Sequence, residues 1–202
     1  MKTGIAVTVT LACLIGCTLL LFAGWELIII GALCVLFAFL YTTGPYPLSY
    51  NGWGDVLVII FFGFVPVGGT YYVQALTWTP DVTIASIICG LLIDTLLVVN
   101  NYRDREADAR SGKRTVIVRF GEKFGRYFYL LLGISASLLC LYFLREGHIY
   151  AALLPQLYLV PHVLTWRRMV KIHSGKKLNS ILGETSRNML FMGILLAIGM
   201  IL

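Results

Sequence analysis

The sequence predicts an all-α integral membrane protein with about seven transmembrane helices, and two observations lead to this fold class. Hydrophobic residues make up 58% of the 202-residue chain and charged residues only 13%, which leaves too little polar surface to cover a soluble globule. The apolar residues also gather in runs about long enough to cross a hydrocarbon core of roughly 30 Å as helices. Helices are expected because an open strand in lipid would leave backbone groups unpaired.

The apolar runs follow one another along a chain that no linker, repeat or low-complexity stretch divides, so we expect one domain over residues 1–202. The first run is too long for a signal peptide and lacks a convincing cleavage site. A tight turn at "GWE" separates it from the second run, which is short. The expected spans are residues 3–23, 27–42, 55–73, 83–100, 123–143, 149–166 and 186–202.

The basic residues predict the orientation of the chain in a cell membrane. If the N-terminus lies inside, every Lys and Arg except Arg145 falls in an inner segment or at an inner helix end. Because Lys and Arg are enriched in cytoplasmic loops, we expect the N-terminus and the loop after the fourth span to be cytoplasmic. The net charge of +6 then favours contact with anionic membrane lipid and not with nucleic acid.

A charged stretch, "NNYRDREADARSGKRT" (100–115), follows the fourth apolar run directly. Asn100, Asp104 and Asp108 recur every four residues, so on a helix they share one stripe, whereas Glu106 falls near the opposite side. One amide oxygen and two carboxylates are ligands that Mg²⁺ accepts, with phosphate oxygens and waters completing its octahedron. The stretch therefore predicts a magnesium site for a diphosphate.

Basic residues in the same stretch fit a diphosphate as well. They are Arg103, Arg110, Lys113 and Arg114, and the glycine of "SGKRT" lets the backbone reverse so that Lys113 or Arg114 could return toward a phosphate. Cations placed there would stabilise a departing pyrophosphate. The alternative is an ordinary cytoplasmic loop whose charges are solvated at the membrane surface.

The stretch "LLVVNNYRDREADARSGKRTVIVRFG" (96–121) closely resembles the second Asp-rich motif of the UbiA superfamily of intramembrane prenyltransferases. Its form is similar to that of the branch that prenylates 1,4-dihydroxy-2-naphthoate in menaquinone synthesis. Two further stretches resemble the same branch, namely "YTTGPYPLSYNGWGD" (41–55) and "FFGFVPVGGTYYVQ" (61–74).

The resemblance implies a helical bundle that uses Mg²⁺ to transfer a polyprenyl group from polyprenyl diphosphate to an aromatic acceptor. Asn100, Asp104 and Asp108 would hold the metal, and Lys113 and Arg114 would lie near the diphosphate. Arg103 is a further candidate for substrate binding. The two aspartates and these two bases would then be the catalytic residues.

The sequence also departs from the family, whose members usually have nine helices and a first Asp-rich motif on the second. Counted against that pattern, this chain begins at the third helix. Asn51 and Asp55 have a suitable spacing, but their glycine-rich surroundings favour a structural or substrate-gating loop. We therefore expect a partner segment to supply the other helices; the alternative is a non-catalytic homologue that binds prenyl diphosphate.

Two residues outside the motif are candidates for substrate binding. Asp94 lies inside the fourth span, where an ionisable group either contacts the acceptor or, when protonated, bonds a neighbouring helix. Tyr72 either lines the cavity, where its ring would stabilise an allylic cation, or anchors the outer interface.

Other membrane classes fit less well. A retinal protein would need a Lys in its last span, and a CDP-alcohol phosphotransferase would need a D-G-x-x-A-R segment that is absent here. A transporter is supported only by Asp94 and by the kinks expected at Pro66 and Pro161. Prenyl transfer to another aromatic acceptor stays open.

Overall fold

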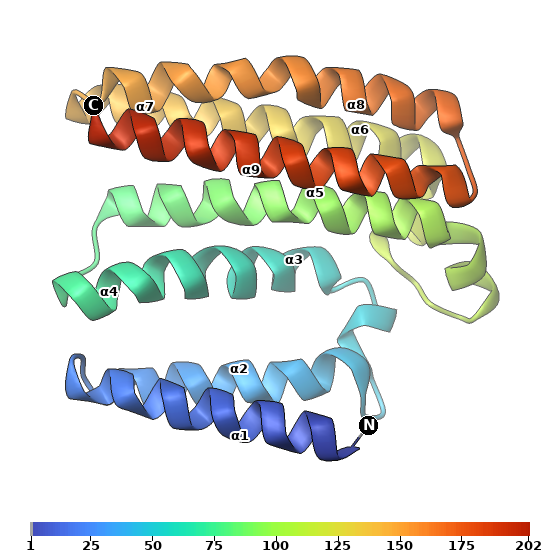
Figure 1. The fold of residues 1–202 in the computed structure, drawn as a ribbon. Helices are drawn as coiled ribbons and strands as arrows, with labels where there is room; N and C mark the ends of the chain where they lie inside the picture. Colours follow the sequence, from blue (N-terminus) through green and yellow to red (C-terminus); the bar gives the residue numbers. More distant parts are fainter. Residues whose placement is uncertain (1) are drawn as a thin grey trace.

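The computed structural model describes residues 2–202, and this part of the chain is helical with no strand. The helices lie side by side along one long axis (Figure 1). They are α1 (Lys2–Thr18), α2 (Glu26–Thr42), α3 (Gly54–Val58), α4 (Gly69–Ala75), α5 (Pro80–Arg110), α6 (Val116–Leu139), α7 (Ile149–Leu153), α8 (Leu159–Ile172) and α9 (Asn179–Ile201).

Tighter or wider helical turns join several of these elements into longer rods. A π-helical segment, Ile59–Gly68, connects α3 to α4, and a 3-10 segment, Leu154–Tyr158, connects α7 to α8. Another 3-10 segment, Cys140–Glu146, extends α6. Each apolar run predicted from the sequence therefore lies in one helical rod, except that residues 22–23 of the first run and Leu202 of the last lie just past a helix end.

Five of these rods are long and apolar enough to cross a membrane, so the chain is a multi-pass membrane protein. Helix α2 is apolar but shorter, and the α7–α8 rod, which carries Arg167 and Arg168, is outside this set. The fourth rod extends further than predicted, because α5 continues unbroken from Pro80 to Arg110.

Helix α5 lies at the centre of the fold. Its first turn is capped by the Thr79 hydroxyl, which accepts a hydrogen bond from the Val82 N–H, and Pro80 occupies the first helical position. At about 1.5 Å per residue the helix is about 46 Å long, which exceeds a hydrocarbon core of roughly 30 Å. Its last turns therefore extend beyond the membrane core, which is where the acidic residues lie.

The main core packs α5 against α6, α8 and α9. Val98, Val99 and Tyr102 of α5 are completely buried there, against Tyr129 of α6 and Met169 of α8. Helices α1 and α2 lie apart from this core (Figure 1), and their side chains are largely exposed. Phe37 of α2 contacts Phe61 of the π-helical segment, and the centroids of the two rings lie 5.2 Å apart.

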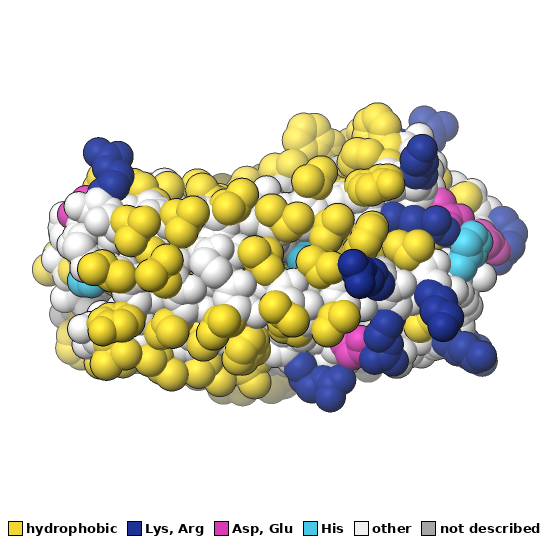
Figure 2. Space-filling model, turned by 90° about the horizontal axis from the view of Figure 1, so that it is seen from above, with side chains coloured by type: hydrophobic (Ala, Val, Ile, Leu, Met, Phe, Trp, Pro, Cys, Tyr) yellow, Lys and Arg dark blue, Asp and Glu magenta, His cyan; other side chains and the backbone are white. Residues whose placement is uncertain are grey.

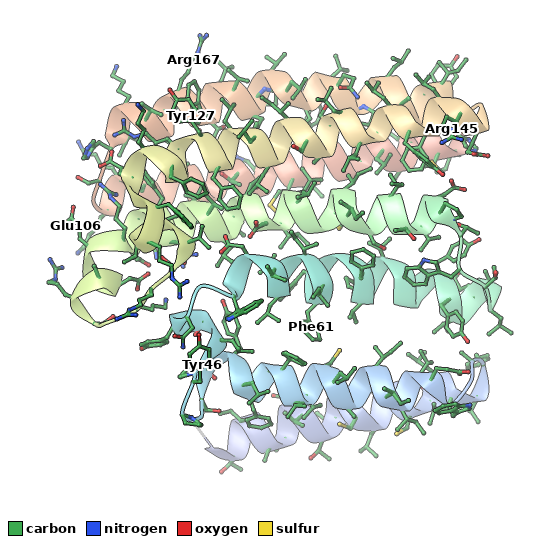
Figure 3. All side chains as sticks on the ribbon, turned by 180° about the vertical axis from the view of Figure 1, so that it is seen from behind. Tyr46, Phe61, Glu106, Tyr127, Arg145 and Arg167 are labelled. Carbon is green, nitrogen blue, oxygen red and sulfur yellow. The ribbon has the colours of Figure 1, made fainter. Side chains whose placement is uncertain are left out.

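The charged residues gather at one end of the bundle. Helix α1 begins at the end where α5 turns into α6, and the C-terminus lies at the opposite end (Figure 1). Lys and Arg side chains crowd that first end, while apolar side chains cover most of the remaining face (Figure 2). Arg145 lies at the far end from Glu106 (Figure 3). This arrangement matches the predicted separation of Arg145 from the other bases, and which end is cytoplasmic remains a prediction.

The π-helical segment crosses α5 at two glycines that allow the backbones to touch. A Cβ placed on Gly90 would lie 2.9 Å from the Ile59 Cα and 3.0 Å from the Ile59 carbonyl oxygen. A Cβ on Gly63 would overlap the Ser86 carbonyl oxygen. Because the obstacles are backbone atoms, any side chain here forces the two helices apart.

We expect Gly90→Ala to lower the free energy of unfolding by about 1–3 kcal/mol, because the methyl group overpacks a backbone contact. A lower midpoint of thermal unfolding in detergent would show this. The matched control is Gly69→Ala, whose Cβ would have nothing within 4 Å. An unchanged midpoint for Gly90→Ala would mean that the helices separate without cost.

Candidate functional site

The predicted acidic stripe lies on the last turns of α5. Asn100, Asp104 and Asp108 are all helical and partly buried, at the charged end of the bundle. Glu106 points away from the bundle (Figure 3), and its side chain is 68% exposed. Asp104 and Asp108 therefore share the face of Asn100, and Glu106 does not, as the four-residue spacing predicts, because one continuous helix carries all four residues.

Arg103 joins two members of the stripe to each other and to a distant helix. Its guanidinium donates to both carboxylate oxygens of Asp104, at 2.7 and 2.5 Å, and to the Asn100 side-chain oxygen at 2.8 Å. It also donates to the Asn179 side-chain oxygen, at 3.0 Å, at the start of α9. Arg103 thus covers oxygens of Asn100 and Asp104 that the sequence assigns to a metal.

Lys113 returns to the third member of the stripe. After α5 ends, Gly112 adopts a φ of +77°, and the Lys113 N–H donates to the Asp108 carbonyl oxygen at 2.9 Å. This reversal brings the Lys113 ammonium within 3.4 Å of Asp108 Oδ1. Asp108 Oδ2 is buried and has no hydrogen-bond partner within residues 2–202. The turn predicted at "SGKRT" is therefore confirmed, and it leaves one carboxylate oxygen free for a ligand.

The loop between α2 and α3 packs against the turn between α5 and α6. The Arg114 N–H donates to the Tyr50 carbonyl oxygen at 2.7 Å, and the Lys113 ammonium lies over the Tyr50 ring, 5.8 Å from its centroid. Arg119 donates to the Asn51 carbonyl oxygen at 2.7 Å and to the Arg114 carbonyl oxygen at 3.1 Å. Two segments distant in sequence thus form one surface at the end of the stripe.

Sequence reasoning did not select Tyr50 or Arg119. One signal in the sequence pointed to these residues. The loop between α2 and α3 and the turn between α5 and α6 were both expected on the cytoplasmic side, and both lie in stretches that resemble the same family. Pairing the loops, however, requires knowing which helices are neighbours.

We expect Arg119→Gln to loosen both loops, because it removes a charged donor shared by two carbonyl oxygens. Amide hydrogen exchange should speed up about tenfold in peptides that cover residues 47–53 and 111–115. Arg110→Gln is the control, because Arg110 is exposed and its side chain makes no hydrogen bond within residues 2–202. Equal exchange in both variants would contradict the idea that Arg119 holds the two loops together.

The remaining predicted residues lie away from the stripe. Asp94 is fully buried, and neither of its carboxylate oxygens has a hydrogen-bond partner within residues 2–202. It lies six residues before Asn100, which is about 9 Å along α5 at about 1.5 Å per residue. Asp55, expected in a loop, is instead buried in the first turn of α3, because the helix already begins at Gly54. Tyr72 lies on α4, at the end of the bundle opposite the stripe (Figure 1). The structure therefore does not bring Tyr72 or Asp94 together with the charged cluster.

The donor set fits an open magnesium site and not an enclosed one. Within residues 2–202, no three His, Cys, Asp or Glu side chains are grouped so that they could hold a metal ion. The free oxygen of Asp108 and the oxygens of Asp104 and Asn100 are hard ligands on one helix face. Mg²⁺ commonly binds through one or two carboxylates and takes its other ligands from water and phosphate. These residues suit an ion that arrives with a diphosphate.

Comparison with known proteins gives several close matches. A sequence model described as the UbiA prenyltransferase family matches residues 2–200. A protein of Escherichia coli named 1,4-dihydroxy-2-naphthoate octaprenyltransferase is 39% identical over 147 residues, covering 70% of this chain and 47% of its own. Proteins of the same name from Haemophilus influenzae and Mycobacterium leprae are 41% and 37% identical, covering 55% and 68% of this chain and 36% and 47% of their own. The chain spans about half the length of the curated relatives it matches, or less, and no solved structure gives a significant match.

Proposed function

Because the chain belongs to the UbiA prenyltransferase family, we propose that it transfers a polyprenyl group from polyprenyl diphosphate to 1,4-dihydroxy-2-naphthoate with the help of Mg²⁺. The observation that carries this proposal is the acidic stripe on α5 with Lys113 folded back onto it. The names of the relatives support the naphthoate as acceptor. The proposal places the reaction at the cytoplasmic face of the membrane.

The residues of this chain would bind and orient the diphosphate. Lys113 and Arg114 supply positive charge beside the stripe, and Arg103 supplies more if its guanidinium turns from Asp104 to a phosphate. These cations favour breaking the bond between the allylic carbon and the diphosphate oxygen, because negative charge builds up on the departing pyrophosphate. Mg²⁺ held by Asn100, Asp104 and Asp108 would neutralise part of the same charge. The electron-rich ring then bonds to the allylic carbon, with loss of its carboxyl group as carbon dioxide.

We propose that a second acidic segment, on this polypeptide or on another, completes the site. The family resemblance implies two such motifs, and the acidic stripe on α5 corresponds to one of them. The largely exposed side chains of α1 and α2 leave surface on which further helices can pack.

The test is prenyl transfer by the purified chain in detergent, with Mg²⁺, polyprenyl diphosphate and 1,4-dihydroxy-2-naphthoate. We expect transfer that depends on Mg²⁺ and that rises when the first two helices of a relative are added. Transfer to a different aromatic acceptor would correct the acceptor alone. Binding of polyprenyl diphosphate without transfer under any of these conditions would favour the non-catalytic alternative.

A further inference from the structure

A second charged feature lies outside the proposed site, in a pocket between α6 and α8. Its volume is about 440 Å³. Helices α6 and α8, which line it, lie on the side of the bundle away from α1 and α2 (Figure 1). Tyr127 and Arg167 lie at the same end of the bundle as Glu106 (Figure 3), so the pocket is at the charged end. Its lining residues are Glu122, Lys123, Arg126, Tyr127, Trp166 and Val170.

The pocket carries an excess of positive charge. Its one acid, Glu122, is already paired with Arg126, with Arg105 at 3.3 Å and with His173 at 3.0 Å. Lys123 is exposed and makes no hydrogen bond or ion pair within residues 2–202. Arg167, the residue after Trp166 on α8, is likewise exposed and unpaired in the described chain. An anion entering the pocket would therefore meet a free ammonium group and no free carboxylate.

An aromatic wall holds the shape of the pocket. The Trp166 indole N–H donates to the Arg126 carbonyl oxygen at 2.8 Å, which ties α8 to α6. The Tyr127 and Trp166 rings lie 6.3 Å apart, and Tyr127 is 50% exposed. Trp and Tyr favour the level of lipid headgroups, because their rings are apolar and each carries a polar group.

Apolar side chains continue from the pocket toward the middle of the membrane. Leu131 follows Tyr127 by one turn of α6 and is 57% exposed. Leu138 follows Tyr127 by about three turns on the same face of α6 and is 53% exposed. The basic pocket, the aromatic wall and the apolar side chains beyond them match a molecule with an anionic head and long apolar chains.

We propose that the pocket between α6 and α8 binds the phosphate headgroup of an anionic phospholipid, whose acyl chains lie along Leu131 and Leu138. Lys123 contacts the phosphate, and Tyr127 and Trp166 flank the glycerol backbone. The site is separate from the acidic stripe on α5 and does not depend on the proposed prenyl transfer. Basic pockets between membrane helices on the cytoplasmic side commonly hold such headgroups.

The test is native mass spectrometry of the whole chain in detergent, titrated with phosphatidylglycerol or phosphatidylcholine of the same acyl chains. We expect preferential binding of phosphatidylglycerol, and about fivefold weaker binding after Lys123→Gln, which removes one positive charge near the phosphate. Two control variants lose the same single positive charge as Lys123→Gln. Lys176→Gln removes a base from the 3-10 turn Lys176–Leu178 before α9, which lies at the same end of the bundle (Figure 1) and outside the pocket lining. Arg145→Gln removes a base from the opposite end (Figure 3).

Three results would overturn the proposal. One is equal binding of the two lipids. Another is an equal loss of phosphatidylglycerol binding in all three variants, which would indicate diffuse attraction to the charged end. The third is displacement of the lipid by glycerol 3-phosphate at similar concentration, which would make the pocket a site for free phosphate compounds.

Discussion

Asp104→Asn is expected to lower the rate of prenyl transfer by about a hundredfold or more, because the substitution removes the charge at the centre of the acidic stripe while keeping its shape. Asp104 lies between Asn100 and Asp108 on the same face of α5. The measurement is the rate of product formation at saturating polyprenyl diphosphate over a range of Mg²⁺ concentrations.

The matched control is Glu106→Gln, which removes an acid two residues away on the exposed side of the same helix. We expect this variant to keep its activity and its magnesium dependence. Equal losses in the two variants would show that the general negative charge of the helix end matters and that the stripe does not.

Arg103→Met is expected to affect metal and diphosphate binding in opposite directions. The guanidinium now covers oxygens of Asn100 and Asp104, so its removal should tighten binding of a divalent ion in the absence of substrate by about tenfold. The same change removes a cation near the diphosphate and should raise the KM for polyprenyl diphosphate. Binding of Mn²⁺, followed by electron paramagnetic resonance, and steady-state kinetics measure the two effects separately.

The control for Arg103 is Arg110→Met, on the last residue of α5. Arg110 is exposed, and its side chain makes no ion pair or hydrogen bond within residues 2–202. Tighter Mn²⁺ binding in both variants would mean that only the total charge changed. Weaker Mn²⁺ binding in Arg103→Met would mean that Arg103 holds the ligands in place for the metal.

The Arg103 contacts also suggest how substrate binding would alter the site. Arg103 links α5 to Asn179 on α9, and Lys113 links Asp108 to the following turn. The metal ion would compete with these bases for Asp104 and Asp108, and the diphosphate would attract both bases. Arg103 and Lys113 would then move from the acids to the phosphates.

Local patterns in the sequence determined the class of the protein and the chemistry of its candidate site. Apolar composition and run length predicted a helical membrane protein, because the bilayer sets both the polarity and the length of a span. The spacing of Asn100, Asp104 and Asp108 predicted their shared face, because helix periodicity depends only on residues close together in the chain. Gly112 likewise predicted the turn that brings Lys113 back to Asp108, because a tight turn also depends only on neighbouring residues.

Tertiary structure decided which distant residues meet. The contacts of Arg103 with Asn179 and of Arg119 with Asn51 join segments 76 and 68 residues apart. The burial of Asp55, in the first turn of the helix that begins at Gly54, follows from how the rod Gly54–Ala75 packs on α5. Such contacts depend on which helices are neighbours and at what height they cross. The apolar runs of the sequence say little about which helices are neighbours or at what height they cross. The reason is that one apolar surface packs on another with little directional preference.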